Sequence, residues 1–333
     1  MSAVATRPAG LLDCIEADLK AVEERLIAET RSDIGAVRDI SGHTLLSGGK
    51  RLRPAIAMLA ARTVGNEVPL HRAYAAAAAV EMIHMATLMH DDVVDEAAER
   101  RGRPTANAVY GNGITILTGD FLLAKSIWLL SRDEENLALV RLFADVTIAM
   151  AEGEVLQAAV SGRYETPLST YEQVIERKTA RFLAGCTEAG GLLGGATEAE
   201  AAALRSFGHH LGIAFQIADD LLDFLGDPKQ TGKPLGTDLR DGRVTLPLIH
   251  TLTVCDSATQ AELSVLLERG QALTDANVAS VTALIARHGG FEKARGIAEK
   301  RAERAIEELA RFPDNVYKET LITLARYVVS RDR

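Results

Sequence analysis

The strongest constraint on the fold of this chain is a short acidic pattern inside an apolar run. Asp91, Asp92 and Asp95 interrupt a stretch that is otherwise hydrophobic from Leu88 to Val94. Residues four positions apart share one face of a helix, so Asp91 and Asp95 present their carboxylates to the same region of space. Carboxylates bordered by apolar residues need a counter-charge, and hard divalent cations with oxygen ligands supply one.

The same spacing occurs a second time, between Phe215 and Phe224. One such triad can arise by chance in an acidic chain, but two of them predict a pair of helices that face each other across a cavity. Because phosphate oxygens usually complete the coordination of Mg²⁺, the pair predicts a magnesium cluster that bridges a diphosphate. The candidate metal ligands are Asp91, Asp92, Asp95, Asp219, Asp220 and Asp223.

Composition and hydrophobic patterning indicate a globular helical protein. The 333 residues are 47% hydrophobic and 25% charged, which is enough for a large core. No segment shows sustained period-two alternation, so the predicted fold class is all-α. The two acidic motifs lie far apart in the chain and need each other. We therefore expect one domain over residues 1–333, with residues 1–10 flexible.

The charge and cysteine content exclude several functions and compartments. A net charge of −9, with no basic tail, argues against a nucleic-acid partner. The three cysteines have no paired spacing and are expected to be reduced thiols. The first ten residues lack the features of a signal peptide, and the alanine-rich run at 73–80 is too short to span a bilayer. We expect a cytoplasmic protein without stable membrane insertion.

A basic segment before the first motif has the features of an anion site. Gly48 and Gly49 allow a tight turn and close approach of a ligand. Lys50, Arg51 and Arg53 follow at the start of a helix, where free N–H groups and the helix dipole also favour an anion. We interpret this segment as a phosphate site.

Further basic residues accompany each acidic motif. Arg100 and Arg101 follow the first motif and can clamp phosphate oxygens. After the second motif, residues 226–243 begin with a glycine- and proline-rich loop that is typical of a mobile lid. Lys233 in this lid could close on a phosphate, and Arg243 could contribute to the same site.

Apolar periodicity and turn residues predict the helices. The main ones are Leu11–Arg31, Ala55–Val64, Leu70–Asp95, Ile114–Leu130, Leu137–Val160, Thr170–Leu193 and Thr197–Leu225, with more helices from Leu246 onward.

These motifs, in this order, closely resemble the trans-polyprenyl diphosphate synthase family over nearly the whole chain. The matching segments are Gly48–Pro54, Asp91–Gly102, Lys178–Thr179, Phe215–Asp223 and Gly232–Asp238. The resemblance implies a helical bundle around a deep central cavity, a homodimer, and Mg²⁺-dependent condensation of isopentenyl diphosphate with an allylic diphosphate.

The resemblance also implies roles for individual residues. The diphosphate of isopentenyl diphosphate would be held by Lys50, Arg53, His84 and Arg101. The allylic diphosphate would be held by Arg100, Lys178 and Lys233, with Thr179 and Gln216 near the reacting carbons. Arg243 is a departure, because the family often has lysine there. The charge is kept, but the part of this residue in lid closure is left open.

Small side chains below the first motif favour a long product. Ala86 and Thr87 occupy the place, about one helical turn below the motif, where early-stopping members carry a bulky residue. Farther down that face, Met82 is the main obstruction. This pattern predicts an open tunnel and a product of about six to ten isoprene units (about C30–C50), used for a quinone side chain.

Four alternatives remain open. A short-chain synthase making a farnesyl or geranylgeranyl product would share the motifs, but the small Ala86 argues against it. A class I terpene cyclase ionises the same substrate but carries a different second metal motif. A non-catalytic partner subunit would have lost the acidic triads. A helical scaffold would not need the triads, the glycine pair and a basic lid together.

Overall fold

The computed structural model of the chain describes residues 10–49, 51–65, 67–100, 102–132, 136–227, 234–267 and 273–330. Three predicted site residues, Lys50, Arg101 and Lys233, lie outside the described residues. The same holds for residues 1–9 and for part of the predicted lid.

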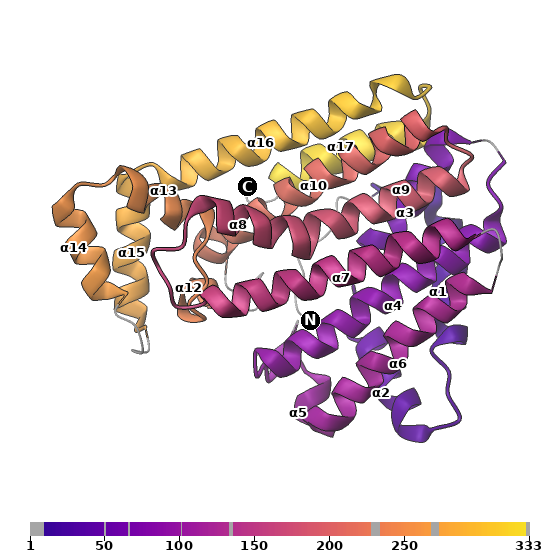
Figure 1. Ribbon diagram of the computed structural model, residues 1–333, viewed down its shortest axis with the longest axis horizontal. Coiled ribbons are helices and arrows are strands. Elements are labelled where there is room, and N and C mark those ends of the chain that lie inside the picture. The colour runs from indigo at the N-terminus through magenta and orange to yellow at the C-terminus, as the bar shows by residue number, and fades with distance from the viewer. Residues whose placement is uncertain are drawn as a thin grey trace.

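Helices build almost the whole described structure, so the all-α prediction is confirmed (Figure 1). The two strands form a two-residue antiparallel pair. The α-helices are α1 Glu16–Glu29, α2 Gly35–Leu46, α3 Leu52–Val64, α4 Leu70–Val94, α5 Ala106–Tyr110, α6 Asn112–Ser131, α7 Leu137–Val160, α8 Leu168–Ile175, α9 Arg181–Leu193, α10 Glu198–Leu225, α12 Thr237–Arg240, α13 Leu246–Val254, α14 Ser257–Leu266, α15 Asp275–Arg287, α16 Gly290–Glu308 and α17 Val316–Ser330. The strands are β1 Glu99–Arg100 and β2 Arg103–Pro104, and the short helical turns are η1 Asp13–Ile15, η3 Glu176–Ala180 and η4 Leu309–Arg311.

The predicted helix over residues 170–193 is divided in the structure. It consists of α8, a π-helical turn over Glu176–Ala180 (η3), and α9. A π turn inserts one extra residue and is common at functional sites. Here the turn contains Lys178 and Thr179, two residues that the sequence assigns to the substrate site.

Helices α9 and α10 pack very closely along their length. A Cβ atom placed on Gly212 of α10 would lie 2.5 Å from the Cα of Ala180, so only glycine fits this crossing without a backbone shift. Gln216 lies one turn farther along α10, and its side-chain oxygen accepts a 2.8 Å hydrogen bond from the Thr179 hydroxyl. The close crossing therefore sets the position of two predicted site residues.

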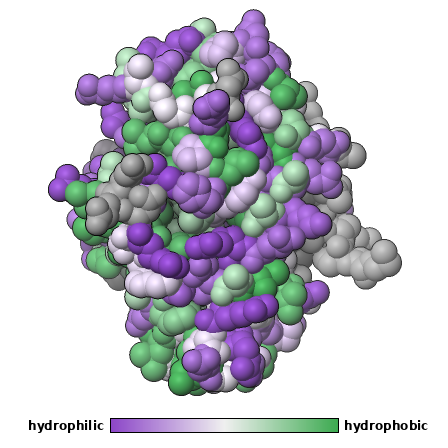
Figure 2. Space-filling view, turned by 90° about the vertical axis from the view of Figure 1, so that its right-hand side faces the viewer, coloured by the Kyte–Doolittle hydropathy of each residue, from purple (hydrophilic) through white to green (hydrophobic). Residues whose placement is uncertain are grey.

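The C-terminal ends of α4, α7 and α10 lie at the same end of the bundle, next to α12 (Figure 1). These ends carry both acidic motifs. Figure 2 shows the right-hand end of the bundle in Figure 1, where α4 and α10 begin, and hydrophilic and hydrophobic side chains are interspersed over that face. Between the two ends, a large hydrophobic cluster surrounds α4, with fully buried members such as Met82 and Ala86.

Candidate active site

Two cavities lie beside the acidic motifs. The larger, of about 440 Å³, is lined by the Gly48–Gly49 turn, by Arg53 of α3, by His84 and Asp92 of α4, and by Asp219 of α10. It therefore joins the predicted anion segment to both acidic motifs. Sequence reasoning expected this convergence, and the structure brings these elements together.

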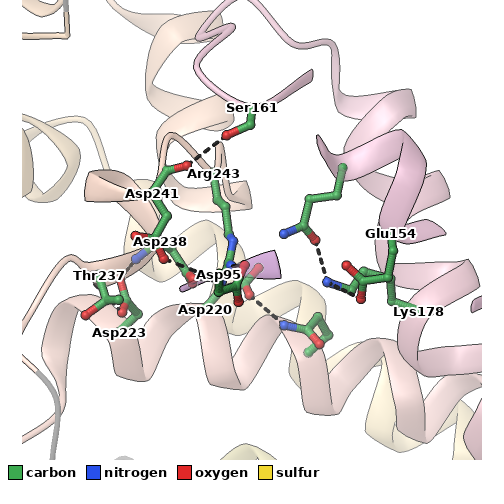
Figure 3. A network of polar contacts seen from close by, with 12 residues as sticks. Asp95, Glu154, Ser161, Lys178, Asp220, Asp223, Thr237, Asp238, Asp241 and Arg243 are labelled. Atoms are coloured by element: carbon green, nitrogen blue, oxygen red, sulfur yellow. Dashed lines mark hydrogen bonds and ion pairs between the residues drawn. The ribbon is translucent and has the colours of Figure 1, made fainter. Parts of the chain in front are cut away.

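The second cavity lies on the other side of the α10 motif. It has a volume of about 110 Å³, and its walls include Lys178 of η3, Gln216 and Asp220 of α10, and Arg243 from the loop after α12. Figure 3 shows Arg243 and Lys178 approaching this region from opposite sides. Cations thus border the acidic helices in both cavities.

Arg53 is a buried cation with spare hydrogen-bonding capacity. A guanidinium group can only donate, so the 3.0 Å contact from Arg53 Nη1 makes Nε2 of His84 the acceptor. The guanidinium carbon lies 5.0 Å from the centre of the Phe182 ring. Among the described residues, none accepts a hydrogen bond from Arg53 Nε. Burial lowers the pKa of Arg53, and nearby negative charges oppose that shift.

No neutralising carboxylate is bonded to Arg53 within the described chain segments. Burial raises the pKa of the adjacent Cys186 thiol to about 12, so this thiol is neutral and supplies no charge at neutral pH. Asp91 and Asp219 act on Arg53 only through longer-range attraction. A buried charge is costly unless it is paired, so this arrangement favours binding of an anion.

Lys178 is held by two side chains of α7. Its Nζ lies 2.6 Å from a carboxylate oxygen of Glu154 and 2.9 Å from the amide oxygen of Gln157 (Figure 3). Glu154 also raises the pKa of Asp91, although burial is the larger cause, and together they bring it to about 7. Lys178 therefore neutralises part of an acidic region that includes the first motif.

Most of the six predicted metal ligands have protein partners. Asp92 accepts a 2.7 Å bond from Arg100, and Asp95 accepts one of 2.7 Å from Arg243. The Asp223 carboxylate accepts hydrogen bonds from the backbone N–H groups of Thr237 and Asp238, both at 3.1 Å. In the part of the chain that the structure covers, no group of three or more acidic, histidine or cysteine side chains is already arranged to hold a metal ion.

The donor set nevertheless fits a hard divalent cation. Carboxylate oxygens are the ligands that Mg²⁺ prefers, and it usually takes only one or two carboxylates and completes its coordination with waters and phosphates. Asp91 on α4, Asp95 immediately after α4 and Asp219 on α10 are the residues that could hold it. To bind the metal, the Asp95 carboxylate would have to give up its ion pair with Arg243.

Asp220 has a different environment from the other carboxylates. It is almost completely buried, and it accepts hydrogen bonds of 2.6 Å from the Tyr171 hydroxyl and 3.0 Å from the Gln216 amide. Burial, with Asp238 as the next cause, raises its pKa to about 8. In this structure Asp220 orients Gln216, which in turn accepts the bond from Thr179. A role of Asp220 as a metal ligand stays a prediction.

The metal-free protein is expected to lose stability as the pH rises from about 4 to about 8. The ordinary pKa of an aspartate is 3.8, and that of Asp220 in the fold is about 8. Over this window the folded carboxyl keeps its proton while the unfolded one has released it, so the free energy of unfolding falls with rising pH. Urea unfolding in a chelating buffer at several pH values measures the slope. Asp220→Asn should flatten it, and equal slopes in the two proteins would contradict the assignment.

The part of the lid that the structure describes, residues 234–243, is tied to several elements. Besides the bonds to Asp223, the backbone N–H of Gly162 after α7 donates a 2.8 Å bond to the carbonyl of Gly242. Arg240 contacts Asp275 of α15 at 2.6 Å. Arg243 reaches Asp95 from this anchored segment, which connects the second half of the chain to the first motif.

The three predicted chain-length residues lie along α4. Ala86 and Met82 are fully buried in the main hydrophobic cluster. Thr87 is half-buried, and its hydroxyl donates to the carbonyl of His84 at 2.9 Å. The apolar side chains that this helix contributes to the larger cavity are Met85 and Leu88 instead. The open tunnel past Ala86 stays a prediction.

Sequence reasoning missed several residues of the site. Phe182 stacks near Arg53, Tyr171 holds Asp220, and Glu81 lines the larger cavity. Phe182 and Tyr171 are aromatic residues on α9 and α8, and Glu81 is an isolated acidic residue of α4, so none of the three belongs to a recognisable motif. Phe182 lies four residues after Lys178, so its position one helical turn beyond a predicted site residue was the available signal.

Comparison with known proteins agrees with this geometry. The model of the polyprenyl synthetase family matches residues 35–285. The chain is 37% identical over 318 residues to an octaprenyl diphosphate synthase of Haemophilus influenzae, covering 95% of this chain and 94% of that protein. It is 38% identical over 322 residues to an all-trans-nonaprenyl-diphosphate synthase of Rhodobacter capsulatus, covering 96% and 97%.

Solved structures show the same fold. A decaprenyl diphosphate synthase from Rhodobacter capsulatus superimposes with a TM-score of 0.90 at 39% identity, covering 97% of this chain and 98% of that one. A polyprenyl synthase from Caulobacter crescentus, complexed with calcium and isoprenyl diphosphate, gives a TM-score of 0.89 at 35% identity, covering 98% and 100%. On this agreement of sequence, fold and site, the chain is a member of the polyprenyl synthetase family.

Proposed function

We propose that this protein is a Mg²⁺-dependent trans-prenyltransferase that condenses isopentenyl diphosphate with an allylic diphosphate and releases an all-trans long-chain polyprenyl diphosphate. The observation that carries the proposal is the meeting of two acidic motifs with buried Arg53 on one side and Lys178 on the other. Two separate cationic regions suit two diphosphates. The calcium and isoprenyl diphosphate of the Caulobacter crescentus structure are consistent with such a site.

Ionisation of the allylic substrate separates charge, and the protein must stabilise both the cation and the anion that result. The C–O bond of the allylic substrate breaks and leaves an allylic cation and a diphosphate anion. The double bond of isopentenyl diphosphate then forms the new C–C bond with the cation, and the departing diphosphate takes up the proton that is lost. Bound Mg²⁺ would neutralise the leaving group.

Side chains of this protein bind and orient the two substrates. Arg53 and His84, with Lys50 and Arg101 beyond the described residues, would hold the diphosphate of isopentenyl diphosphate. Fixed cations stabilise the departing anion electrostatically without reorganisation. The residues in that role are Arg100, Lys178, Lys233 and Arg243. Thr179 and Gln216, linked by their hydrogen bond, lie where they could orient the reacting carbons.

The product is proposed to be long and to serve as a quinone side chain. The curated relatives include octaprenyl and nonaprenyl synthases, and small Ala86 is compatible with them. The fold alone does not separate this class from short-chain enzymes, because a geranylgeranyl pyrophosphate synthetase from Pyrococcus horikoshii superimposes with a TM-score of 0.89 at 28% identity. A short-chain product is therefore the second candidate.

A homodimer through α6 and α7 completes the proposal. Both helices expose apolar side chains, among them Leu117 (67% exposed) and Trp128 on α6 and Ile148 and Val155 on α7. Among the described residues, α6 is the one helix that is long and apolar enough to cross a membrane. Core helices of soluble proteins can meet the same two criteria. Burial of this face in a dimer accounts for its composition.

We also propose a cytoplasmic location. Free Cys14, Cys186 and Cys255 suit it, because thiols stay reduced in the cytosol.

A product assay tests the proposal. The enzyme is incubated with Mg²⁺, farnesyl diphosphate and labelled isopentenyl diphosphate, and the products are resolved by length. We expect a ladder that ends at about thirty carbons or more, because Ala86 and Thr87 below the motif are small side chains and would leave room for a growing chain. A stop at about fifteen or twenty carbons would retain the chemistry but assign a short-chain enzyme, with Met82 as the first residue to examine. No elongation would favour the cyclase or the partner subunit.

A further inference from the structure

Arg51 lies between the glycine turn and α3 and borders the larger cavity, yet its guanidinium is bonded to residues of α1, α2 and α4. Its Nε and Nη2 bind both carboxylate oxygens of Glu23 on α1, at 2.9 and 3.1 Å. Its Nη1 binds Glu81 of α4 at 2.9 Å, and Nη2 also donates to the carbonyl of Leu45 at 3.1 Å. These bonds occupy four of the five N–H groups of the guanidinium, so all three of its nitrogens are engaged by Glu23, Glu81 and Leu45.

The backbone of Arg51 supports the same conclusion. Its φ of 47° lies in the left-handed region, which non-glycine residues adopt only when the surrounding contacts enforce it. The four hydrogen bonds supply that enforcement. Arg51 is thus fixed between α1, α2 and α4 immediately before the helix that carries Arg53.

Glu81 is the residue through which Arg51 can affect the anion site. Its side chain is only 5% exposed, it lines the same cavity as Arg53, and it lies one helical turn before His84. Its negative charge acts on both Arg51 and Arg53. Without Arg51, Glu81 would be a buried carboxylate beside a buried guanidinium, and such groups pair when geometry permits because an unpaired buried charge is costly.

We propose that Arg51 is a positioning residue that holds Glu81 away from Arg53 and so keeps Arg53 available for the diphosphate of isopentenyl diphosphate. The inference rests on the proposed function, which places that diphosphate at Arg53. In this arrangement the two arginines that flank Leu52 have different roles. Arg53 faces the ligand, and Arg51 neutralises the internal anion that would otherwise compete with the ligand.

The test is equilibrium binding of isopentenyl diphosphate, measured by calorimetry in a chelating buffer without allylic substrate. Arg51→Met is expected to raise the Kd by at least about tenfold, because Glu81 then pairs with Arg53. Glu81→Gln is measured alone as the single-change reference for the double variant. The decisive variant is the double change Arg51→Met with Glu81→Gln, which should recover most of the lost affinity because the competing carboxylate is gone.

A purely structural role of Arg51 would give a different result. The two changes would then weaken binding additively, and a double variant as weak as Arg51→Met would overturn the proposal. Arg62→Met is the matched control, since Arg62 of α3 forms a similar two-bond pair with Asp18, which lies on α1 like Glu23, at 2.8 and 3.2 Å. It should lower the melting temperature without changing the Kd. If Arg51→Met does not fold, Arg51→Lys, whose single ammonium cannot span Glu23 and Glu81, replaces it in the same comparison.

Failure of the proposed function would look different again. If Arg53→Met leaves the Kd for isopentenyl diphosphate unchanged, the diphosphate does not bind at Arg53. The assignment of that substrate site then fails, and the role of Arg51 fails with it. If Arg53→Met abolishes binding while the double variant is not recovered, the substrate site stands and only the role of Arg51 is refuted.

Discussion

Replacement of Asp91 or Asp219 by alanine is expected to lower kcat/KM by at least about a thousandfold, because electrostatic stabilisation of the leaving diphosphate is lost. Asp91 lies near the end of α4, where burial and Glu154 raise its pKa to about 7. Asp219 borders the larger cavity from α10. Each is the first carboxylate of its motif, and each helix supplies one side of the proposed metal cluster. Steady-state kinetics at several Mg²⁺ concentrations measure the loss.

The control for this prediction is Asp120→Ala. Asp120 lies on α6 near His90, with its side chain 60% exposed and outside both described cavities. It should leave kcat/KM unchanged. Circular dichroism and thermal unfolding should show that Asp91→Ala and Asp219→Ala remain folded, since removing one carboxylate from an acidic region relieves repulsion. Retention of most of the activity in either variant would refute the role of the two motifs in metal binding.

Much of the helical architecture could be predicted from apolar periodicity. The bounds of α7 agree with the predicted Leu137–Val160, and α4 and α10 differ from prediction by one residue each. These helices are long and apolar on their buried faces, so the pattern is strong. Helix α2, Gly35–Leu46, was not predicted, because Ser41, Gly42 and His43 interrupt its pattern and its helical form depends on tertiary packing.

The residues of the site were easier to predict than their pairings. Spacing identified the acidic triads and the basic residues. It placed Arg51 in the phosphate segment but did not reveal that its nitrogens bind Glu23, Glu81 and a backbone carbonyl. The contact of Arg243 with Asp95 joins residues 148 positions apart. Such pairings depend on how helices cross, and a motif that is local in sequence contains no information on that crossing.

The two cationic regions predict opposite kinetic effects when each is removed. Arg53→Met is expected to raise the KM for isopentenyl diphosphate by about a hundredfold, because a buried guanidinium that donates charge-assisted hydrogen bonds is lost. The KM for the allylic substrate should stay within about threefold of the parent value. Lys178→Met should show the reverse pattern, since Lys178 borders the other cavity.

Each of these variants is the control for the other, and the comparison does not depend on absolute activity. Arg53 contacts His84 and Phe182, whereas Lys178 contacts Glu154 and Gln157, so the two sets of partners do not overlap. A variant that merely loosened the fold would raise both KM values together. Initial rates measured with one substrate varied and the other saturating separate these cases. If Arg53→Met raised only the KM of the allylic substrate, the two diphosphate sites would have to be exchanged, and the larger cavity would hold the substrate that ionises.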